Sequence, residues 1–194
     1  MARQLAAHFG LAYLDTGSLY RAVALQVSIN GEKAENDDAA VRAASELDAS
    51  LLGDPRLRSG KVGEAASVVA ANPKVREEVL GFQRRFAAAP EGAVLDGRDI
   101  GTIVCPHADV KIFVVADSEV RATRRFEELQ TRGEDVSHES VLADLRARDA
   151  RDQGRSVAPL KRADDSLLHD TSELDIETAF KVAVSMIDGQ MSAN

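Results

Sequence analysis

The chain has few of the residues on which several large classes of protein depend. Cys105 is its only cysteine, so an internal disulfide is impossible and no Cys-x-x-Cys metal spacing occurs. Aromatic residues make up 4% of the chain and tryptophan is absent, which argues against a stacking platform for single-stranded nucleic acid. No stretch approaches the roughly 20 apolar residues of a membrane span, and Gln4 and His8 interrupt any signal-peptide core. We therefore expect a cytoplasmic protein with no membrane partner.

Basic charge is also in deficit. The chain has 32 acidic and 24 basic residues, a net charge of −8 at pH 7, whereas a protein that binds polynucleotides neutralises many phosphates with Lys and Arg. We expect no nucleic-acid partner, although a local basic face can still bind one small phosphorylated ligand. The apolar fraction of 44% is that of an ordinary globular protein. A length of 194 residues suffices for one domain, so we expect a single domain over residues 1–194 and a monomer.

Short apolar runs alternate with helical patterns along the chain. The runs are 11–14, 93–95, 110–115 and 166–169. They lack the polar alternation of half-exposed strands, which predicts parallel strands covered on both faces. Between them apolar residues recur at helical spacing, as at Leu19, Val23 and Val27, and Pro73 is placed to open another helix. The pattern predicts an α/β protein with an open parallel sheet flanked by helices.

One segment, residues 28–67, interrupts this alternation. Its turn-forming groups, Asn30-Gly31 and Gly53-Asp54-Pro55, surround a helical stretch from Ala40 to Leu47. We interpret it as a surface insertion between sheet units and not as a second domain.

Polar side chains follow two of the apolar runs directly. Asp15 ends the first run, and Arg21 lies in the first turn of the helix that follows. Arg98 and Asp99 come just after the run 93–95. Ligands of open α/β sheets bind at the carboxyl ends of strands, and helix N-termini attract anions, so these residues are candidates for an anion site. The simpler alternatives are a solvated arginine, helix caps and a turn with a local Asp–Arg pair.

Arginine is unusually frequent among the basic residues. Eighteen of the 24 are arginine, and nine of these lie between residues 121 and 162. A GC-rich genome, which favours arginine codons, is one explanation. The other is that arginine grips phosphate through two hydrogen bonds, which lysine cannot do.

Position favours the phosphate explanation in one helix. Arg148, Arg151 and Arg155 have the spacing i, i+3 and i+7 and share one helical face. Like charges stacked in this way cost a few tenths of a kcal/mol per pair, about what one opposite-charge pair restores, unless an anion lies over them. Asp152 relieves part of that repulsion, so a salt-bridged exposed helix is the alternative. With the nearby patch of Arg121, Arg124 and Arg125, the helix predicts a polyphosphate clamp, while Arg132 lies outside every cluster.

A weaker signal comes from Ser67, Arg76 and Gln83, polar residues on an otherwise apolar pair of helices. They could reach the edge of a base. A buried serine in a helix is common, however, and these residues alone settle nothing.

Taken together, these segments resemble those of bacterial cytidylate kinases. Residues 14–21 resemble the LDTGxxYR motif of that family, and residues 63–67 with Val75-Arg76 resemble its AAS and VR elements. Residues 96–102 are similar to its DGRDIGT motif, and residues 148–160 to its RDxxDxxRxxAPL motif. The likeness keeps this order from about Ala2 to Ile187. Adenylate kinases, the relatives most easily confused with this family, have DGFPR in place of DGRD.

The resemblance implies a phosphate-loop nucleoside-monophosphate-kinase fold, with an NMP-binding insertion at 28–67 and an arginine-rich lid at 118–156. It implies transfer of the γ-phosphate of ATP to CMP or dCMP in pyrimidine nucleotide metabolism, with ATP as co-substrate and Mg²⁺ as cofactor. No residue of the chain is assigned as a metal ligand.

The resemblance also implies roles for individual residues. Ser67, Arg76 and Asp99 would read the cytosine, and Arg148 with Asp152 the sugar hydroxyls. Arg21, Arg98 and Arg155 would grip the CMP phosphate, and Asp15 completes the substrate-binding set. Arg151 and Arg155 would act on the transferring phosphoryl group, and Arg121, Arg124 and Arg125 would cover ATP.

The chain departs from the family pattern in two ways. The family opens with a strand and a GPxxSGKGT loop, but neither GxxxxGKS nor GxxxxGKT occurs here, so the loop lysine and the Mg²⁺-binding hydroxyl are missing. We expect the DNA upstream of Met1 to encode that loop, and a sheet position to be empty beside residues 11–14. Segment 49–62 is also shorter than in many members.

We expect the chain as it stands to bind CMP and to phosphorylate it poorly. Two alternatives stay open: a catalytically silent CMP-binding protein, and another nucleoside-monophosphate kinase on the same fold.

Overall fold

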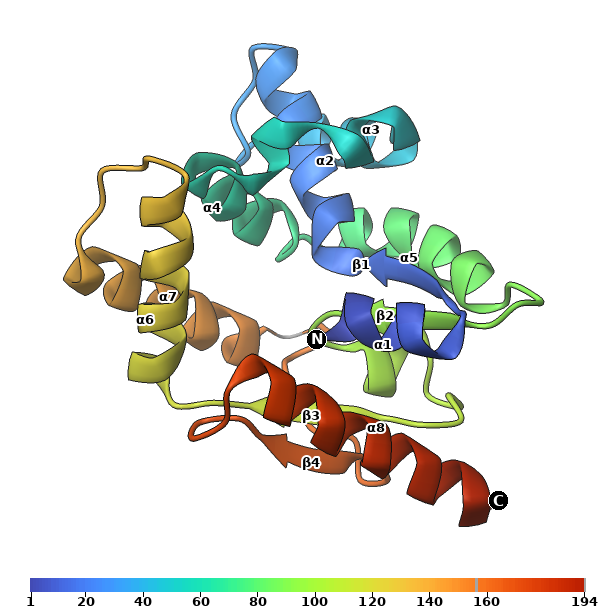
Figure 1. The fold of residues 1–194 in the computed structure, drawn as a ribbon. Coiled ribbons are helices and arrows are strands. Elements are labelled where there is room, and N and C mark those ends of the chain that lie inside the picture. The colour runs from blue at the N-terminus through green and yellow to red at the C-terminus, as the bar shows by residue number, and fades with distance from the viewer. Residues whose placement is uncertain (156, 194) are drawn as a thin grey trace.

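The computed structural model of the chain describes residues 1–155 and 157–193; Ser156, the last residue of the expected lid, and Asn194 lie outside the described residues. Helices and strands alternate along the described chain (Figure 1). In order, they are α1 (Ala2–Phe9), β1 (Ala12–Asp15), α2 (Thr16–Ile29), α3 (Asp37–Ser45), α4 (Gly60–Val69), α5 (Pro73–Ala87), β2 (Ala93–Asp96), β3 (Ile112–Val115), α6 (Ser118–Thr131), α7 (His138–Gly154), β4 (Leu167–Asp170) and α8 (Ile176–Ala193). Short 3₁₀ turns at Ala49–Gly53 and Pro55–Arg58 precede α4, and a π-helical turn at Ile100–Val104 follows β2. None of the helices within the described residues is long and apolar enough to cross a membrane.

The strands form two parallel pairs. β1 pairs with β2 from Ala12↔Ala93 to Asp15↔Asp96, and β3 pairs with β4 from Ile112↔Leu167 to Val115↔Asp170. The α/β fold class, with parallel strands flanked by helices, is therefore confirmed. Within the described chain no pairing joins β2 to β3, and Figure 1 shows β2 on the side of the first pair that faces β3. The break in the sheet thus lies beside β2, and not beside residues 11–14 as the sequence predicts.

Local sequence explains where the helix that carries Arg76 begins. The Asn72 side chain accepts hydrogen bonds from the amides of Lys74 and Val75, and Pro73 occupies the first helical position of α5. Proline suits that position because an amide there has no partner within the helix. Val75 and Val79 then face inward, which places Arg76 one turn from a fixed helix start.

Residues 28–67 share a hydrophobic core with the helices around them. The alanines of α3 (Ala39, Ala40, Ala43 and Ala44) pack with Val23 and Val27 of α2 and with Val75 and Val79 of α5 in one buried cluster. Alanine stripes are short and weakly apolar, so the sequence pattern alone suggests a surface segment. In the structure its last helix, α4, brings Ala66 and Ser67 to the cleft at the strand ends.

Helices α6 and α7 form a hairpin at the position of the expected lid. Ala122 and Leu129 of α6 pack against Val141 of α7. The two terminal nitrogens of Arg121, Nη1 and Nη2, donate to the Asp149 carboxylate at 3.1 and 2.5 Å. These bonds join the two helices. The end of α7 brings Arg148, Asp152 and Arg155 to the same cleft as Asp15 and Asp96, the last residues of β1 and β2.

Candidate functional site

The carboxyl ends of β1 and β2 make the floor of the site. Asp15 and Asp96 are register partners at these ends. The Tyr13 hydroxyl donates to Asp96 Oδ2 at 3.0 Å, and Thr16 Oγ1 donates to the Asp96 carbonyl at 2.7 Å. A Cβ at Gly97 would lie 2.3 Å from Thr16 Oγ1, so only glycine allows the start of α2 to approach this closely.

Two carboxylates therefore lie next to each other below the site. Burial, and then the negative charge of Asp15, raise the pKa of Asp96 above its usual range. Burial, followed by the charge of Asp96, also raises the pKa of the Tyr13 hydroxyl. The floor thus favours hydrogen-bond donors or a cation.

One wall of the site carries a buried ion pair. Arg76 of α5 donates to Asp99 Oδ2, and the two side chains are 8% and 6% exposed. Arg76 also donates to the Ala70 carbonyl at 3.2 Å, and its guanidinium lies 5.4 Å from the centre of the Tyr20 ring. The Ser67 hydroxyl is buried and has no hydrogen-bond partner within the described residues. An unpaired buried hydroxyl beside a fixed ion pair can read a planar polar ligand.

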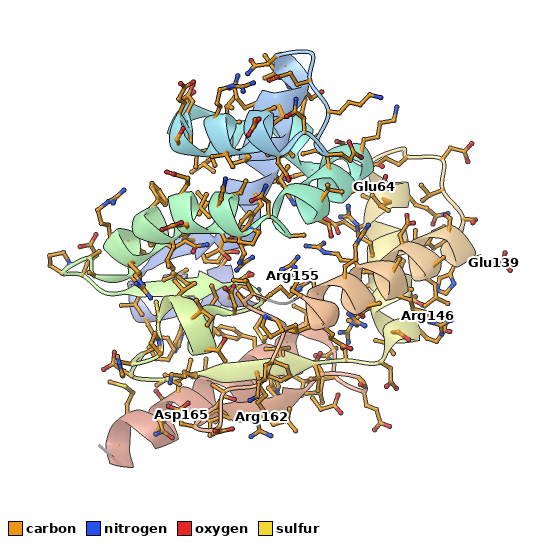
Figure 2. The ribbon with its side chains drawn as sticks, turned by 180° about the vertical axis from the view of Figure 1, so that it is seen from behind. Glu64, Glu139, Arg146, Arg155, Arg162 and Asp165 are labelled. Carbon is orange, nitrogen blue, oxygen red and sulfur yellow. The ribbon has the colours of Figure 1, made fainter. Side chains whose placement is uncertain are left out.

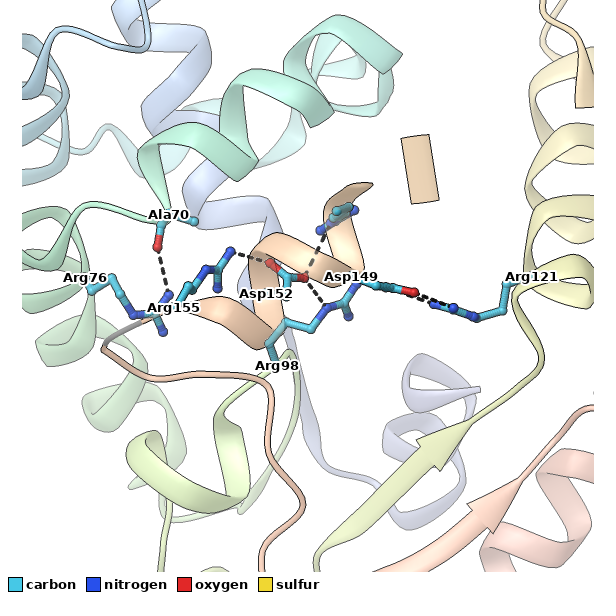
Figure 3. A network of polar contacts seen from close by, with 8 residues as sticks. Ala70, Arg76, Arg98, Arg121, Asp149, Asp152 and Arg155 are labelled. Carbon is cyan, nitrogen blue, oxygen red and sulfur yellow. Dashed lines mark hydrogen bonds and ion pairs between the residues drawn. The ribbon is translucent and has the colours of Figure 1, made fainter. Parts of the chain in front are cut away.

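Next to this pair lies a cluster of arginines around Asp152 of α7, which is 1% exposed (Figure 3). Arg98 Nε donates to Asp152 Oδ2 at 2.9 Å, and Arg155 donates to Oδ1. Arg148 Nε lies 3.9 Å from Oδ2. The Nε atoms of Arg148 and Arg155 are buried without a hydrogen-bond partner in the part of the chain that the structure describes.

The charge of this cluster is unbalanced. Burial, followed by the positive charge of Arg98, lowers the pKa of Arg148 to about 10. Burial also lowers the pKa values of Arg21 and Arg155, and the charge of Asp152 opposes the effect at Arg155. An arginine cluster with one acid and spare donors is suited to a small, multiply charged anion such as a phosphate.

These walls and the floor enclose one cleft. Its lining comprises Asp15, Thr16, Gly17, Tyr20, Arg21, Ala66, Ser67, Ala70, Arg76, Asp96, Gly97, Arg98, Asp99, Arg148, Asp152 and Arg155. The structure therefore brings together every residue that the sequence predicts for substrate binding. Figure 2 shows Arg155 in the middle of the molecule, whereas Glu139, Arg146 and Asp165 lie at its periphery.

The three arginines assigned to the lid and to ATP, and Arg151, assigned to the transferring phosphoryl group, lie outside this lining. Arg121 binds Asp149, and Arg125 Nη1 lies 2.7 Å from Glu128 Oε2. Arg124 donates to the carbonyl oxygens of Thr171 and Leu174 at 2.7 and 2.9 Å. Arg151 is exposed on α7. In this arrangement Arg121 joins the two helices of the hairpin, and Arg124 holds the hairpin against the segment after β4.

Two ionisable residues of the lining, Tyr20 and Asp96, are absent from the set predicted from the sequence. Tyr20 directly precedes Arg21 and occupies an apolar position of α2, where it resembles ordinary core. Asp96 belongs to the DGRD segment but resembles a strand end. Tyr20 carries a signal only once α5 is placed against it, whereas the sequence already shows Asp96 as one of two acids on either side of Gly97.

The whole chain is similar to known proteins. The family model described as cytidylate kinase matches residues 1–188. A cytidylate kinase of Rhodopseudomonas palustris (strain HaA2) is 55% identical over 188 residues, which cover 97% of this chain and 89% of the relative. The cytidylate kinases of Bradyrhizobium diazoefficiens and Xanthobacter autotrophicus are each 54% identical; the matches cover 97% and 98% of this chain, and 89% and 91% of the relatives. With a family match over nearly all its residues and relatives of more than half identity, the chain belongs to the cytidylate kinase family.

Proposed function

We propose that this protein transfers the γ-phosphoryl group of ATP to CMP or dCMP, giving CDP or dCDP. The observation that carries the proposal is the cleft in which Arg98, Arg148 and Arg155 converge on Asp152, and which the buried Arg76–Asp99 pair also lines. The arginines suit a phosphate, and the buried pair suits a base that has both donors and acceptors on one edge.

The base pocket favours cytosine through its hydrogen-bond polarity. Cytosine carries an amino donor at position 4, where uracil-type bases carry an acceptor. Asp99 offers only acceptors and can bind that amino group, while Arg76 and Ser67 can donate to the acceptors of the ring. A uracil ring would place an acceptor against the Asp99 carboxylate.

The sugar and the phosphate would bind at the arginine cluster around Asp152. Arg21, Arg98 and Arg155 would bind the phosphate, and Arg148 with Asp152 the sugar hydroxyls. Because dCMP lacks one of these hydroxyls, it would lose part of this contact and keep the rest.

Phosphoryl transfer requires mainly positioning and positive charge around the transferring group. Arg151 with Arg155 would supply charge there, and Arg121, Arg124 and Arg125 would belong to a lid over ATP. Asp15 and Asp96 offer the oxygen ligands that Mg²⁺ prefers, and Mg²⁺ is commonly held by one or two carboxylates together with substrate phosphates. This donor set fits Mg²⁺ bound with ATP, although the described residues contain no protein-only group of three ligands. When bound, Mg²⁺ would neutralise charge on the phosphates.

We further propose that the 194 residues alone turn over slowly. They contain no GxxxxGKS or GxxxxGKT segment, so the backbone cradle and lysine of such a loop have no counterpart on ATP. Loss of one preorganised donor costs about 10²–10³ in rate, and such losses combine without multiplying. The monomeric state and the cytoplasmic location stay predictions.

A coupled ADP-release assay tests both proposals. The 194-residue chain is compared with a form extended by a strand and a GPxxSGKGT loop, using CMP, dCMP, UMP and AMP as acceptors. We expect CMP and dCMP to be preferred and the extended form to be much faster. CMP binding without turnover in either form would indicate a silent binder, and a preference for AMP or UMP would indicate another kinase. Equal rates in the two forms would contradict the role given to the loop.

A further inference from the structure

Both carboxylate oxygens of Asp152 accept hydrogen bonds from arginine. One carboxylate oxygen accepts from Arg98 at 2.9 Å and the other from Arg155, with Arg148 3.9 Å away. The carboxylate is 1% exposed, so it has no water-facing side on which a ligand could bind without displacing a partner.

The same arginines carry spare donors. The buried Nε atoms of Arg148 and Arg155 have no hydrogen-bond partner within residues 1–155 and 157–193. A carboxylate has two oxygens and one charge, whereas a phosphate monoester carries about −1.5 to −2 and three strong acceptor oxygens. The cluster is therefore built for an anion larger and more highly charged than the one it now holds.

We propose that Asp152 is an internal stand-in for the phosphate of the acceptor nucleotide. The incoming phosphate takes Arg98 and Arg155 away from Asp152, and the released carboxylate then accepts the hydrogen bonds of the sugar hydroxyls. This inference rests on the proposed function, since it presumes a ligand with both groups. Its consequence is that the sugar is recognised only when a phosphate is present.

The surrounding geometry holds the backbone of the acid in place and leaves room for Arg98 to turn. The Asp152 carbonyl accepts a hydrogen bond from the Leu160 amide at 2.8 Å, which fixes the backbone at the end of α7. Arg98 lies on the loop after β2 and is 38% exposed, so its side chain has room to turn. Arg155 is the C-cap residue of α7, beyond the last helical turn. The acid stays in place while the two arginines change partner.

An Asp152→Asn variant tests the proposal, with inorganic phosphate as the probe and calorimetry as the measurement. The amide keeps the size of the side chain but removes the competing charge. A neighbouring charge shifts such an equilibrium by about tenfold or more, so we expect phosphate to bind roughly tenfold tighter to the variant. Asp144→Asn, at an exposed position of the same helix, is the matched control and should leave phosphate affinity unchanged. Unchanged or weaker phosphate binding in Asp152→Asn would mean that the acid only organises the arginines, and would overturn the proposal.

A second measurement uses the unaltered chain and does not depend on the folding of the variant. If phosphate releases Asp152, inorganic phosphate must strengthen the binding of cytidine, and cytidine must strengthen phosphate binding by the same factor. Independent or mutually exclusive binding would contradict the exchange. Neither measurement uses ATP. Failure of the kinase assay with CMP would therefore refute the proposed function without deciding whether phosphate displaces Asp152.

Discussion

Arg98 and Arg155 share Asp152 as a partner, and both belong to the acceptor cleft. A charge-assisted hydrogen bond to a phosphate is worth about 1.5–3 kcal/mol. Arg98→Ala and Arg155→Ala should therefore each weaken CMP binding by about that amount in calorimetry.

The control for these substitutions is Arg42→Ala. Arg42 is 57% exposed and forms one surface ion pair with Glu32, a contact of little energetic value. Arg132, which lies outside the cleft lining, is less suitable because besides its ion pair with Glu128 it donates to the Arg58 carbonyl at 3.4 Å. Equal losses at positions 42, 98 and 155 would reduce the arginines to a solvated charged surface.

Asp96 should make stability depend on pH. Because burial and Asp15 raise its pKa in the folded state, folding favours the protonated carboxyl. That stabilisation is fully present below the ordinary Asp pKa of about 3.9 and is lost as pH rises through the raised folded value. Asp96→Asn should therefore raise the melting temperature at neutral pH, and the gain should shrink in acid. A gain that stays the same across the pH range would show that the charge of Asp96 is not the cause.

Most of the cleft could be predicted from single residues. Asp15 and Asp99 follow short apolar runs closely, and strand ends in such folds meet at one edge. Tyr20 could not be assigned in this way, because its place beside Arg76 depends on how α5 packs against α2. The partners of the arginines could not be predicted either. Their spacing does not indicate that Arg124 donates to backbone carbonyls while Arg148 faces the cleft.

At the scale of elements, the start of α5 determines where Arg76 lies. The Asn72 side chain accepts from two amides of the first turn and donates to Asp37 Oδ1 at 2.8 Å, joining α5 to α3. Replacement of an N-cap residue by alanine costs about 0.5–2 kcal/mol.

Asn72→Ala should therefore lower the free energy of unfolding by at least that amount, as measured by denaturant titration. It should also weaken CMP binding less than a direct loss of Arg76. Asn72→Asp restores the acceptor and should recover most of the helix stability. No recovery would mean that the contact with Asp37, and not the cap, carries the effect.

Apolar runs and caps predict the positions of the helices and strands well. They do not predict which strands pair with one another. All four strands lie within a residue or two of the predicted runs. The separation of β2 from β3 depends on how two segments that are distant in the sequence are placed relative to each other. No local sequence pattern encodes that placement. Open edges of this kind are prone to association.

At the scale of the molecule, an acidic chain concentrates positive charge in one cleft. The net charge is −8, yet five arginines line the acceptor site. The insertion and the hairpin meet at its rim, where Arg21 donates to the Leu57 carbonyl at 2.7 Å and Arg132 reaches Arg58. A cleft with low-dielectric walls focuses such a field on a small anion.

The central claim is that this cleft recognises a nucleotide through its phosphate. Calorimetric titration of CMP and of cytidine into the same 194-residue chain tests it most directly, because the two ligands differ only in that group. Two charge-assisted hydrogen bonds correspond to at least a hundredfold in affinity, so CMP should bind about a hundredfold or more tighter than cytidine. Affinities for CMP and cytidine within about a factor of three, less than 1 kcal/mol apart, would contradict the account.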